Sequence, residues 1–143
     1  MRVEKIPLSL GDWGYNIIIG YKMLSQLGKE VKTVATGEKV GIVTHPRIER
    51  LYGKAVIASF VRAGLDPILV RIPEGERHKT LDGVHSIYNT LIQHRFERSS
   101  TLVALGGGVV GDMTGFAAAT FLRGISYVQC PTTVVGQVDA AIG

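Results

Sequence analysis

The sequence contains a single cysteine, no long hydrophobic run and no cluster of basic residues. Cys130 cannot form an intramolecular disulfide, so the sequence fits a reducing compartment and predicts a cytoplasmic protein. No apolar run is long enough to cross a bilayer, and the N-terminal residues lack the apolar centre of a signal peptide, so we expect no membrane partner. The basic residues are scattered despite a formal net charge of +4, which argues against binding to nucleic acid.

The chain is long and apolar enough to fold as one domain. Its 143 residues are 45% hydrophobic and 20% charged, a composition typical of globular proteins rather than of disordered or fibrous ones. We therefore expect a single domain over residues 1–143. The four histidines show no metal-ligand spacing, so no metal ligand is predicted within this chain.

Short apolar runs alternate with stretches of helical periodicity along the chain. The expected strands cover residues 3–10, 15–20, 40–44, 67–72, 102–105 and 125–130. The expected helices cover residues 22–35, 46–63, 82–95 and 109–120, and a turn is expected at residues 11–14. The helix that starts at Pro46 is expected to bury Ile48, Leu51, Ala55 and Phe60. This alternation predicts an α/β fold, a Rossmann-like, doubly wound and mostly parallel sheet with an antiparallel start.

A glycine-rich stretch, TLVALGGGVVGDMTGFAAAT at residues 101–120, joins a buried strand to a helix. The first turn of a helix has unpaired N–H groups and a partial positive charge, and glycine lets a phosphate approach the backbone. The pattern G-x-G-x-x-G occurs as Gly106, Gly108 and Gly111. The next strand lacks the acidic residue of the standard dinucleotide fingerprint. We interpret the stretch as a phosphate-binding turn, and the alternative is that the glycines only permit tight helix–sheet packing.

Three further features could bind a ligand. The charged loop at residues 73–80 follows a strand, where open α/β sheets bind ligands, although Glu76 and Lys79 could also form an ordinary solvated pair. Arg123 offers a bidentate fork for phosphate, or it caps the preceding helix. Asp139 lies in an otherwise apolar stretch, where a carboxylate is costly unless it has a partner. Anionic small molecules are the expected partners.

The last ten residues, VVGQVDAAIG, begin an apolar helix that stops without a polar cap. We therefore expect the chain to be cut within a longer protein. We also expect the apolar side chains of this segment to promote self-association, or else the segment to be disordered.

Three blocks together resemble the 3-dehydroquinate synthase family: PEGERHK, ALGGGVVGDMTGFAAATFLRG and YVQCPTTVVGQVDAAIG, in the family's order and spacing. The resemblance implies an N-terminal NAD-binding domain, followed in the family by a helical metal-binding domain that is absent here. It implies the conversion of 3-deoxy-D-arabino-heptulosonate 7-phosphate to 3-dehydroquinate and phosphate in the shikimate pathway of aromatic amino acid biosynthesis. The resemblance implies that the full-length enzyme is a homodimer that uses NAD and a divalent metal, zinc or cobalt, as cofactors. This chain alone would be inactive.

The resemblance also implies roles for individual residues. The cofactor-binding residues would be Glu74, Gly75, Glu76, Arg77, His78, Lys79, Gly107, Gly108, Val109, Val110, Gly111, Asp112, Thr132 and Thr133. Asp139 would hold the substrate, and Arg123 would contact its phosphate, across a dimer interface. In the family an acidic or amide residue often stands where His45 does, which puts an adenosine-ribose contact there in doubt. Two serines commonly stand where Ala140 and Ala141 do.

Other functions fit part of this pattern. Another sugar phosphate cyclase, such as a valiolone or inosose synthase, would share the glycine turn and differ in its pocket. Iron-type polyol dehydrogenases share the three glycines but ordinarily lack the Arg-Gly and Pro-Thr-Thr blocks together. A non-catalytic nucleotide-binding module is the alternative from a different class of protein.

Overall fold

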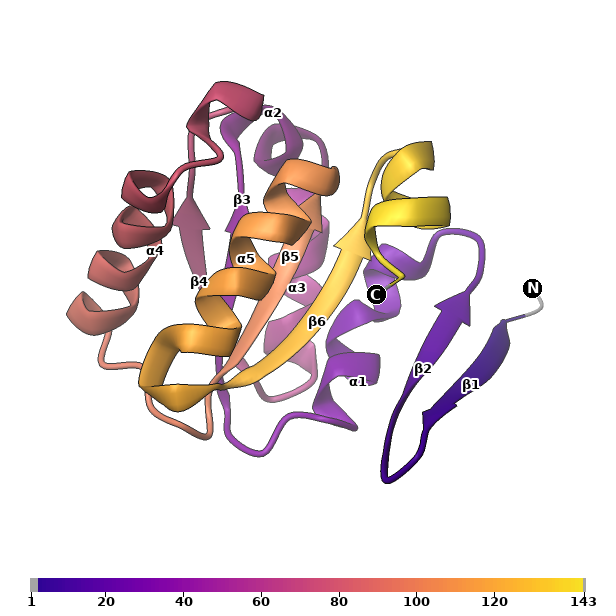
Figure 1. Ribbon diagram of the computed structural model, residues 1–143. Coiled ribbons are helices and arrows are strands. Elements are labelled where there is room, and N and C mark those ends of the chain that lie inside the picture. Colours follow the sequence, from indigo (N-terminus) through magenta and orange to yellow (C-terminus); the bar gives the residue numbers. More distant parts are fainter. Residues whose placement is uncertain (1–2, 143) are drawn as a thin grey trace.

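The computed structural model describes residues 3–142, so Gly143, where the expected final helix ends, lies outside the described residues. The described chain begins with an antiparallel hairpin of β1 (Glu4–Leu10) and β2 (Trp13–Ile19), which forms a sheet of its own (Figure 1). Leu10 pairs with Trp13, so the turn comprises only Gly11 and Asp12. The expected turn at residues 11–14 is therefore two residues too long. Gly11 has a φ of +69°, a conformation that glycine adopts without strain.

The central sheet has four parallel strands. They are β3 (Lys39–Thr44), β4 (Asp66–Arg71), β5 (Thr101–Gly106) and β6 (Ser126–Pro131), in the order β4-β3-β5-β6. A parallel sheet has to be covered on both faces, and β5 is accordingly buried at every residue. This arrangement confirms the predicted α/β, Rossmann-like fold.

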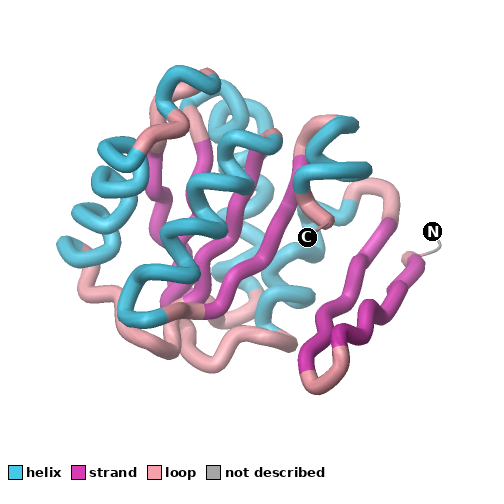
Figure 2. The backbone as a smooth tube through the Cα atoms, in the orientation of Figure 1, coloured by secondary structure: helices cyan, strands magenta, loops and turns pink. Residues whose placement is uncertain are grey.

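Helices cover the two faces of this sheet, as Figures 1 and 2 show. α4 (Leu81–Gln93) and α5 (Gly108–Thr120) pack on one face, and α1 (Leu27–Lys32) and α3 (Lys54–Arg62) pack on the other. Successive side chains of β5 point to opposite faces of the sheet. Leu102 packs against α4 and α5, and Val103 packs against α1 and α3. The short helical turns are η1 (Met23–Gln26), η3 (Glu76–His78), η4 (Phe121–Arg123) and η5 (Gly136–Ala140).

The helix expected from Pro46 consists of three pieces. α2 (Pro46–Ile48) leads into a π-helical segment, η2 (Glu49–Gly53), and then into α3. The prediction that Leu51 and Ala55 are buried is wrong, because both are exposed and Val56 is buried instead. A π-helical turn contains more residues than an α-helical turn, so it shifts the apolar positions that follow it around the helix.

The order in which the chain adds strands to the sheet reverses between β3 and β5. From β3 the chain runs through α3 on one face to β4, whereas from β5 it runs through α5 on the other face to β6. The carboxyl ends of β3 and β5 therefore form the topological switch point, where open α/β sheets bind their ligands. Within residues 3–142, none of the helices combines the length and the hydrophobicity needed to cross a bilayer.

Candidate functional site

The glycine turn lies at the switch point, between the end of β5 and the start of α5. A Cβ atom on Gly106 would lie 2.6 Å from the Val110 side chain, so packing alone requires glycine there. Gly107 and Gly108 are partly exposed, and no side chain caps the N–H groups at the start of α5. Unpaired N–H groups without a flanking Cβ form a site for an anion. Packing therefore accounts for Gly106, whereas the binding of a phosphate at Gly107 and Gly108 stays a prediction.

Two threonines at the end of β6 lie beside this turn. The Thr132 N–H donates a hydrogen bond to the Gly106 carbonyl at 2.8 Å, and a Cβ on Gly107 would lie 3.2 Å from the Thr133 side chain. Thr133 Oγ1 accepts a hydrogen bond from the Gly136 N–H at 3.1 Å. Thr132 Oγ1 is buried without a hydrogen-bond partner among the described residues. This hydroxyl therefore leaves a hydrogen-bond donor beside the glycine turn, and its contact with a ligand stays a prediction.

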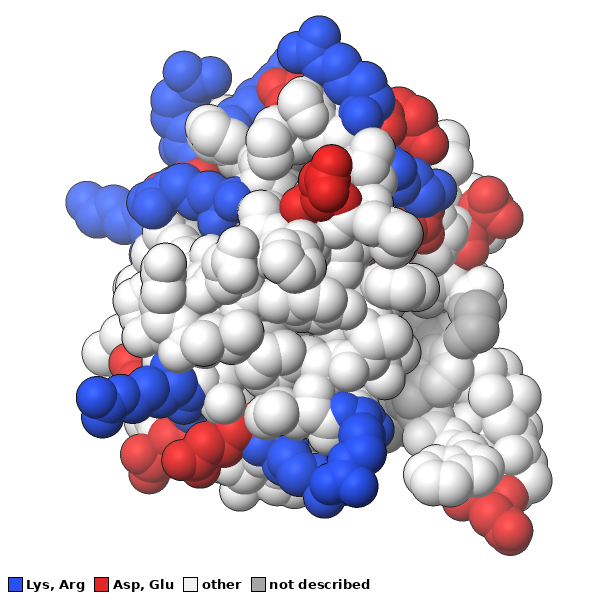
Figure 3. All heavy atoms as spheres, turned by 60° about the vertical axis from the view of Figure 1, so that its left-hand side comes forward, with Lys and Arg blue, Asp and Glu red and all other residues white. Residues whose placement is uncertain are grey.

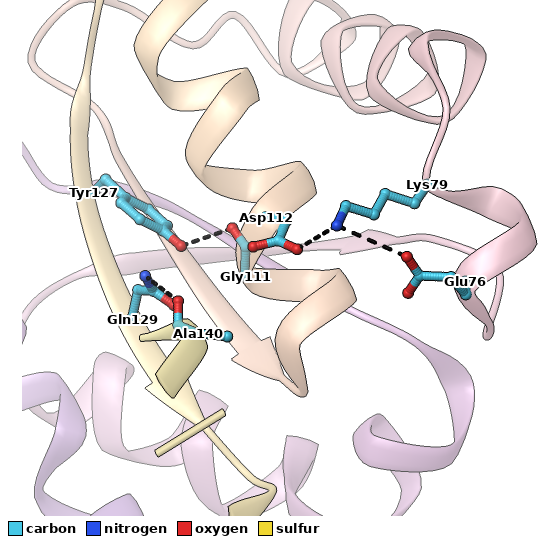
Figure 4. A network of polar contacts seen from close by, with 7 residues as sticks. All are labelled: Glu76, Lys79, Gly111, Asp112, Tyr127, Gln129 and Ala140. Carbon is cyan, nitrogen blue, oxygen red and sulfur yellow. Dashed lines mark hydrogen bonds and ion pairs between the residues drawn. The ribbon is translucent and has the colours of Figure 1, made fainter. Parts of the chain in front are cut away.

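An ion pair joins the charged loop to α5, as Figure 4 shows. Lys79 Nζ lies 2.6 Å from an Asp112 carboxylate oxygen and 3.8 Å from a Glu76 carboxylate oxygen. The hydrogen bond to Asp112, together with its charge, raises the pKa of Lys79. The loop turns at Gly75, whose φ of +113° favours glycine. The structure therefore brings the sequence-predicted loop and the glycine turn together in one site.

Two residues that were not predicted from the sequence, Tyr127 and Gln129, support α5 from β6. Tyr127 Oη donates a hydrogen bond to the Gly111 carbonyl at 2.8 Å, and a Cβ on Gly111 would lie 2.8 Å from Gln129 Oε1 (Figure 4). Burial, and secondarily the charge of Asp112, raises the pKa of Tyr127, so its hydroxyl stays a donor. In the sequence, only the spacing of two residues between Tyr127 and Gln129 indicated that both side chains lie on the same face of β6. Val110 belongs to the core, and its side chain packs against Gly106 of the turn.

Arg123 lies away from this site. It follows α5 in an exposed turn, whereas the glycine turn precedes that helix, so the two are at opposite ends of a helix roughly 20 Å long. Arg123 has a φ of +67°, in the left-handed region. The structure does not bring Arg123 together with the glycine turn of its own chain.

Asp139 belongs to η5, which lies against the glycine turn. A Cβ on Gly108 would contact the Ala140 side chain at 3.4 Å, and Gln129 Nε2 donates to the Ala140 carbonyl at 3.5 Å. Asp139 itself is exposed. The argument that a carboxylate in this stretch is costly unless partnered therefore does not apply, because water solvates the exposed side chain, and the contact of Asp139 with substrate stays a prediction.

Charged side chains are unevenly distributed on the face that Figure 3 presents. Lys and Arg side chains gather toward the top and bottom of this view, acidic side chains lie among them, and the surface between is uncharged.

Within residues 3–142, no group of three or more His, Cys, Asp or Glu side chains could hold a metal ion. Burial raises the pKa of the Cys130 thiol to about 11, so this thiol is protonated at neutral pH.

The sequence matches the family model described as 3-dehydroquinate synthase N-terminal over residues 69–143, which is more than half of the chain. The chain belongs to the 3-dehydroquinate synthase family. It is 49% identical over 138 residues to a 3-dehydroquinate synthase of Rippkaea orientalis and 50% identical over 138 residues to one of Microcystis aeruginosa. Both alignments cover 96% of this chain but only 38% of the relative. The chain thus spans well under half the length of the curated relatives it matches.

Solved structures show the same fold. A 2-deoxy-scyllo-inosose synthase complexed with carbaglucose-6-phosphate, NAD+ and Co2+ superimposes with a TM-score of 0.82 at 22% identity, covering 93% of this chain and 36% of that one. A 2-epi-5-epi-valiolone synthase from Streptomyces hygroscopicus with NAD+ and Zn2+ bound gives 0.80 at 24% identity, covering 95% and 37%. An NADH-dependent butanol dehydrogenase of Thermotoga maritima gives 0.57 at 21% identity, covering 70% and 24%. The fold is thus more similar to those of the two synthases than to that of the dehydrogenase.

Proposed function

We propose that this chain is the N-terminal NAD-binding domain, residues 1–143, of a cytoplasmic 3-dehydroquinate synthase. The enzyme would convert 3-deoxy-D-arabino-heptulosonate 7-phosphate to 3-dehydroquinate and phosphate in the shikimate pathway. One observation carries this proposal: the glycine turn, the Thr132 hydroxyl and the Lys79–Asp112 pair converge at the switch point of the sheet. The 49% and 50% identities to synthases support this activity over that of the cyclase neighbours, which are 22% and 24% identical.

In this proposal each group of predicted residues has a physical task. The N–H groups from Gly107 to Val110 would bind the pyrophosphate of NAD, whereas the Gly111 N–H donates to the Gly107 carbonyl at 3.1 Å. The hydroxyls of Thr132 and Thr133 would donate to the pyrophosphate or to the adjoining ribose. Lys79 would add positive charge, and the remaining loop residues Glu74, Gly75, Glu76, Arg77 and His78 would lie along the adenosine side. NAD, when bound, would accept a hydride from the substrate and return it.

The rest of the reaction would need parts of the protein that this chain does not supply. The described residues offer no metal-ligand set, so we propose that the ligands of a zinc or cobalt ion lie in the remainder of the longer protein. Asp139 would contact the substrate from the exposed side of η5. Arg123 would reach a substrate phosphate only from a second subunit, because it lies at the opposite end of α5 from its own glycine turn. A homodimer would supply that subunit.

Two measurements test the proposal. Calorimetric titration of this chain should detect NAD binding, and the absence of binding would contradict the assigned cofactor site. The chain alone should release no phosphate from the heptulosonate phosphate in the presence of NAD and Zn2+, and addition of the remaining part of the enzyme should restore activity. Steady release by the chain alone would refute its inactivity, and release from other sugar phosphates only would favour another cyclase.

A further inference from the structure

Three polar side chains meet at the carboxyl ends of β3 and β4, outside the cluster around Asp112. One Glu74 carboxylate oxygen lies 3.6 Å from Arg47 Nη1, and the other lies 3.9 Å from His45 Nδ1. Both distances exceed that of a hydrogen bond, so the carboxylate retains its capacity to accept one. The side chains of Arg47 and Glu74 are 68% and 54% exposed, whereas that of His45 is only 12% exposed. The two opposite charges are therefore available to a ligand.

This triad, His45, Arg47 and Glu74, lies across the switch point from the glycine turn. β3 is hydrogen-bonded to β5, with Val43 beside Ala104, so the chain at His45 is level with the end of β5. In dinucleotide-binding folds, a carboxylate beside the glycine-turn strand binds the 2′-hydroxyl of the adenosine ribose, whereas an arginine accommodates a 2′-phosphate. Here His45 follows the neighbouring strand, and the carboxylate comes instead from the loop after β4.

We propose that Glu74 makes this site selective for NAD over NADP, an inference that rests on the proposed function. The Glu74 carboxylate would accept a hydrogen bond from the ribose 2′-hydroxyl and would repel a 2′-phosphate. It also neutralises Arg47, whose guanidinium is otherwise suited to bind a phosphate. Removal of the Glu74 charge therefore both removes a repulsion and frees a cation, and both effects favour NADP.

The test compares the dissociation constants for NAD and NADP by calorimetry in this chain. The unsubstituted chain should bind NAD more tightly. In Glu74→Gln, the ratio of the NADP constant to the NAD constant should fall by roughly tenfold or more. The double variant Glu74→Gln/Arg47→Gln should recover part of the lost selectivity, because it removes the freed cation. Glu97→Gln is the matched control. This exposed glutamate precedes β5, so it lies at the amino-terminal ends of the strands, whereas Glu74 lies at their carboxyl ends.

The outcomes separate the two proposals. If the unsubstituted chain binds neither dinucleotide, the proposed function fails and this inference fails with it. If the chain binds NAD but the ratio in Glu74→Gln stays within about twofold of the parent's, only the role of Glu74 is refuted. A fall in the ratio in Glu97→Gln equal to that in Glu74→Gln would also refute it, since the effect would then reflect net charge.

Discussion

The Lys79 ammonium lies 2.6 Å from the Asp112 carboxylate, and this contact links the loop after β4 to α5. Both side chains are about two-fifths exposed, at 43% and 42%, so the pair is screened by solvent and adds little to stability. It instead sets the position of the loop relative to the glycine turn. A ligand that spans the two would meet them already in place, which lowers the cost of ordering on binding.

Breaking this pair should weaken NAD binding without unfolding the protein. Lys79→Gln removes a positive charge near the expected phosphates, so its dissociation constant for NAD should rise by roughly tenfold. The thermal midpoint should hardly change, and Lys54→Gln on the exposed side of α3 should change neither quantity. Calorimetry and thermal denaturation measure the two effects. An NAD affinity equal to the parent's would place the phosphates elsewhere.

The same pair predicts a direction for pH dependence. The pKa of Lys79 is raised above its ordinary value of 10.5 by Asp112, so the folded state favours the protonated amine. The stabilisation is fully present below pH 10.5 and is lost as the pH rises through the raised pKa. Because solvent screens the pair, its effect on the thermal midpoint is small, so the test is an NMR titration of Lys79, whose pKa should be lower in Asp112→Asn than in the parent. Equal pKa values in the two proteins would contradict the shift.

Gly108→Val should abolish NAD binding. A Cβ on Gly108 would lie 3.4 Å from the Ala140 side chain, which is ordinary contact, so the branched side chain would displace η5 or occupy the space of the pyrophosphate. The fold should lose little stability because this part of the turn is half exposed. Ala119→Val on the exposed side of the same helix controls for the lower helix propensity of valine. If calorimetry shows parental affinity in Gly108→Val, the turn does not bind the phosphate.

The sequence predicted the sheet well because its two central strands, β3 and β5, are buried on both faces. β5 has an uninterrupted apolar run, and a run of this kind bounded by glycine has few alternatives to a central strand. The errors have local causes. Trp13 and Gly14 pair with Leu10 and Ser9 although glycine at position 14 suggests a turn, and the π-helical segment at Glu49–Gly53 shifts the buried face of the helix after it.

The site was predictable only in part. The glycine turn is local in sequence, so its place between a buried strand and a helix could be recognised from Gly106 to Gly111. The contact between Lys79 and Asp112 and the support of Gly111 by Tyr127 depend on how strands and helices pack, which periodicity does not specify. The exposure of Asp139 could not be inferred either, because an apolar stretch does not reveal which of its sides faces solvent.

The final segment should promote self-association. Val134, Val135 and Val138 are 74%, 65% and 69% exposed, and each forgoes about 1.5–3 kcal/mol of burial. Sedimentation should therefore detect dimers or larger species, and Val135→Asp should shift them toward monomer. Val61→Asp, at an exposed valine of α3, should leave the association unchanged. A monomeric parent whose amides in residues 134–142 are protected from hydrogen exchange would refute this prediction.

Thr132 and Thr101 provide a matched pair that separates binding from stability. Each has a buried hydroxyl without a hydrogen-bond partner among the described residues. Thr132 adjoins the glycine turn at the carboxyl ends of the strands, whereas Thr101 is the first residue of β5, at their amino-terminal ends. An unpartnered buried hydroxyl costs about 1–3 kcal/mol, so replacement by isosteric valine should raise the free energy of unfolding by about 1 kcal/mol at either position.

Only Thr132→Val should weaken NAD binding, because only this hydroxyl lies where the ligand is expected. Denaturant titration would measure the stability of both variants, and calorimetry their affinity for NAD. Thr101→Val should bind NAD like the parent, which shows whether a stabilised core alone alters affinity. A stabilised Thr132→Val with parental NAD affinity would remove this hydroxyl from the site. A destabilised Thr132→Val would indicate a protein partner for the hydroxyl, and the ligand would no longer be needed to explain why threonine stands there.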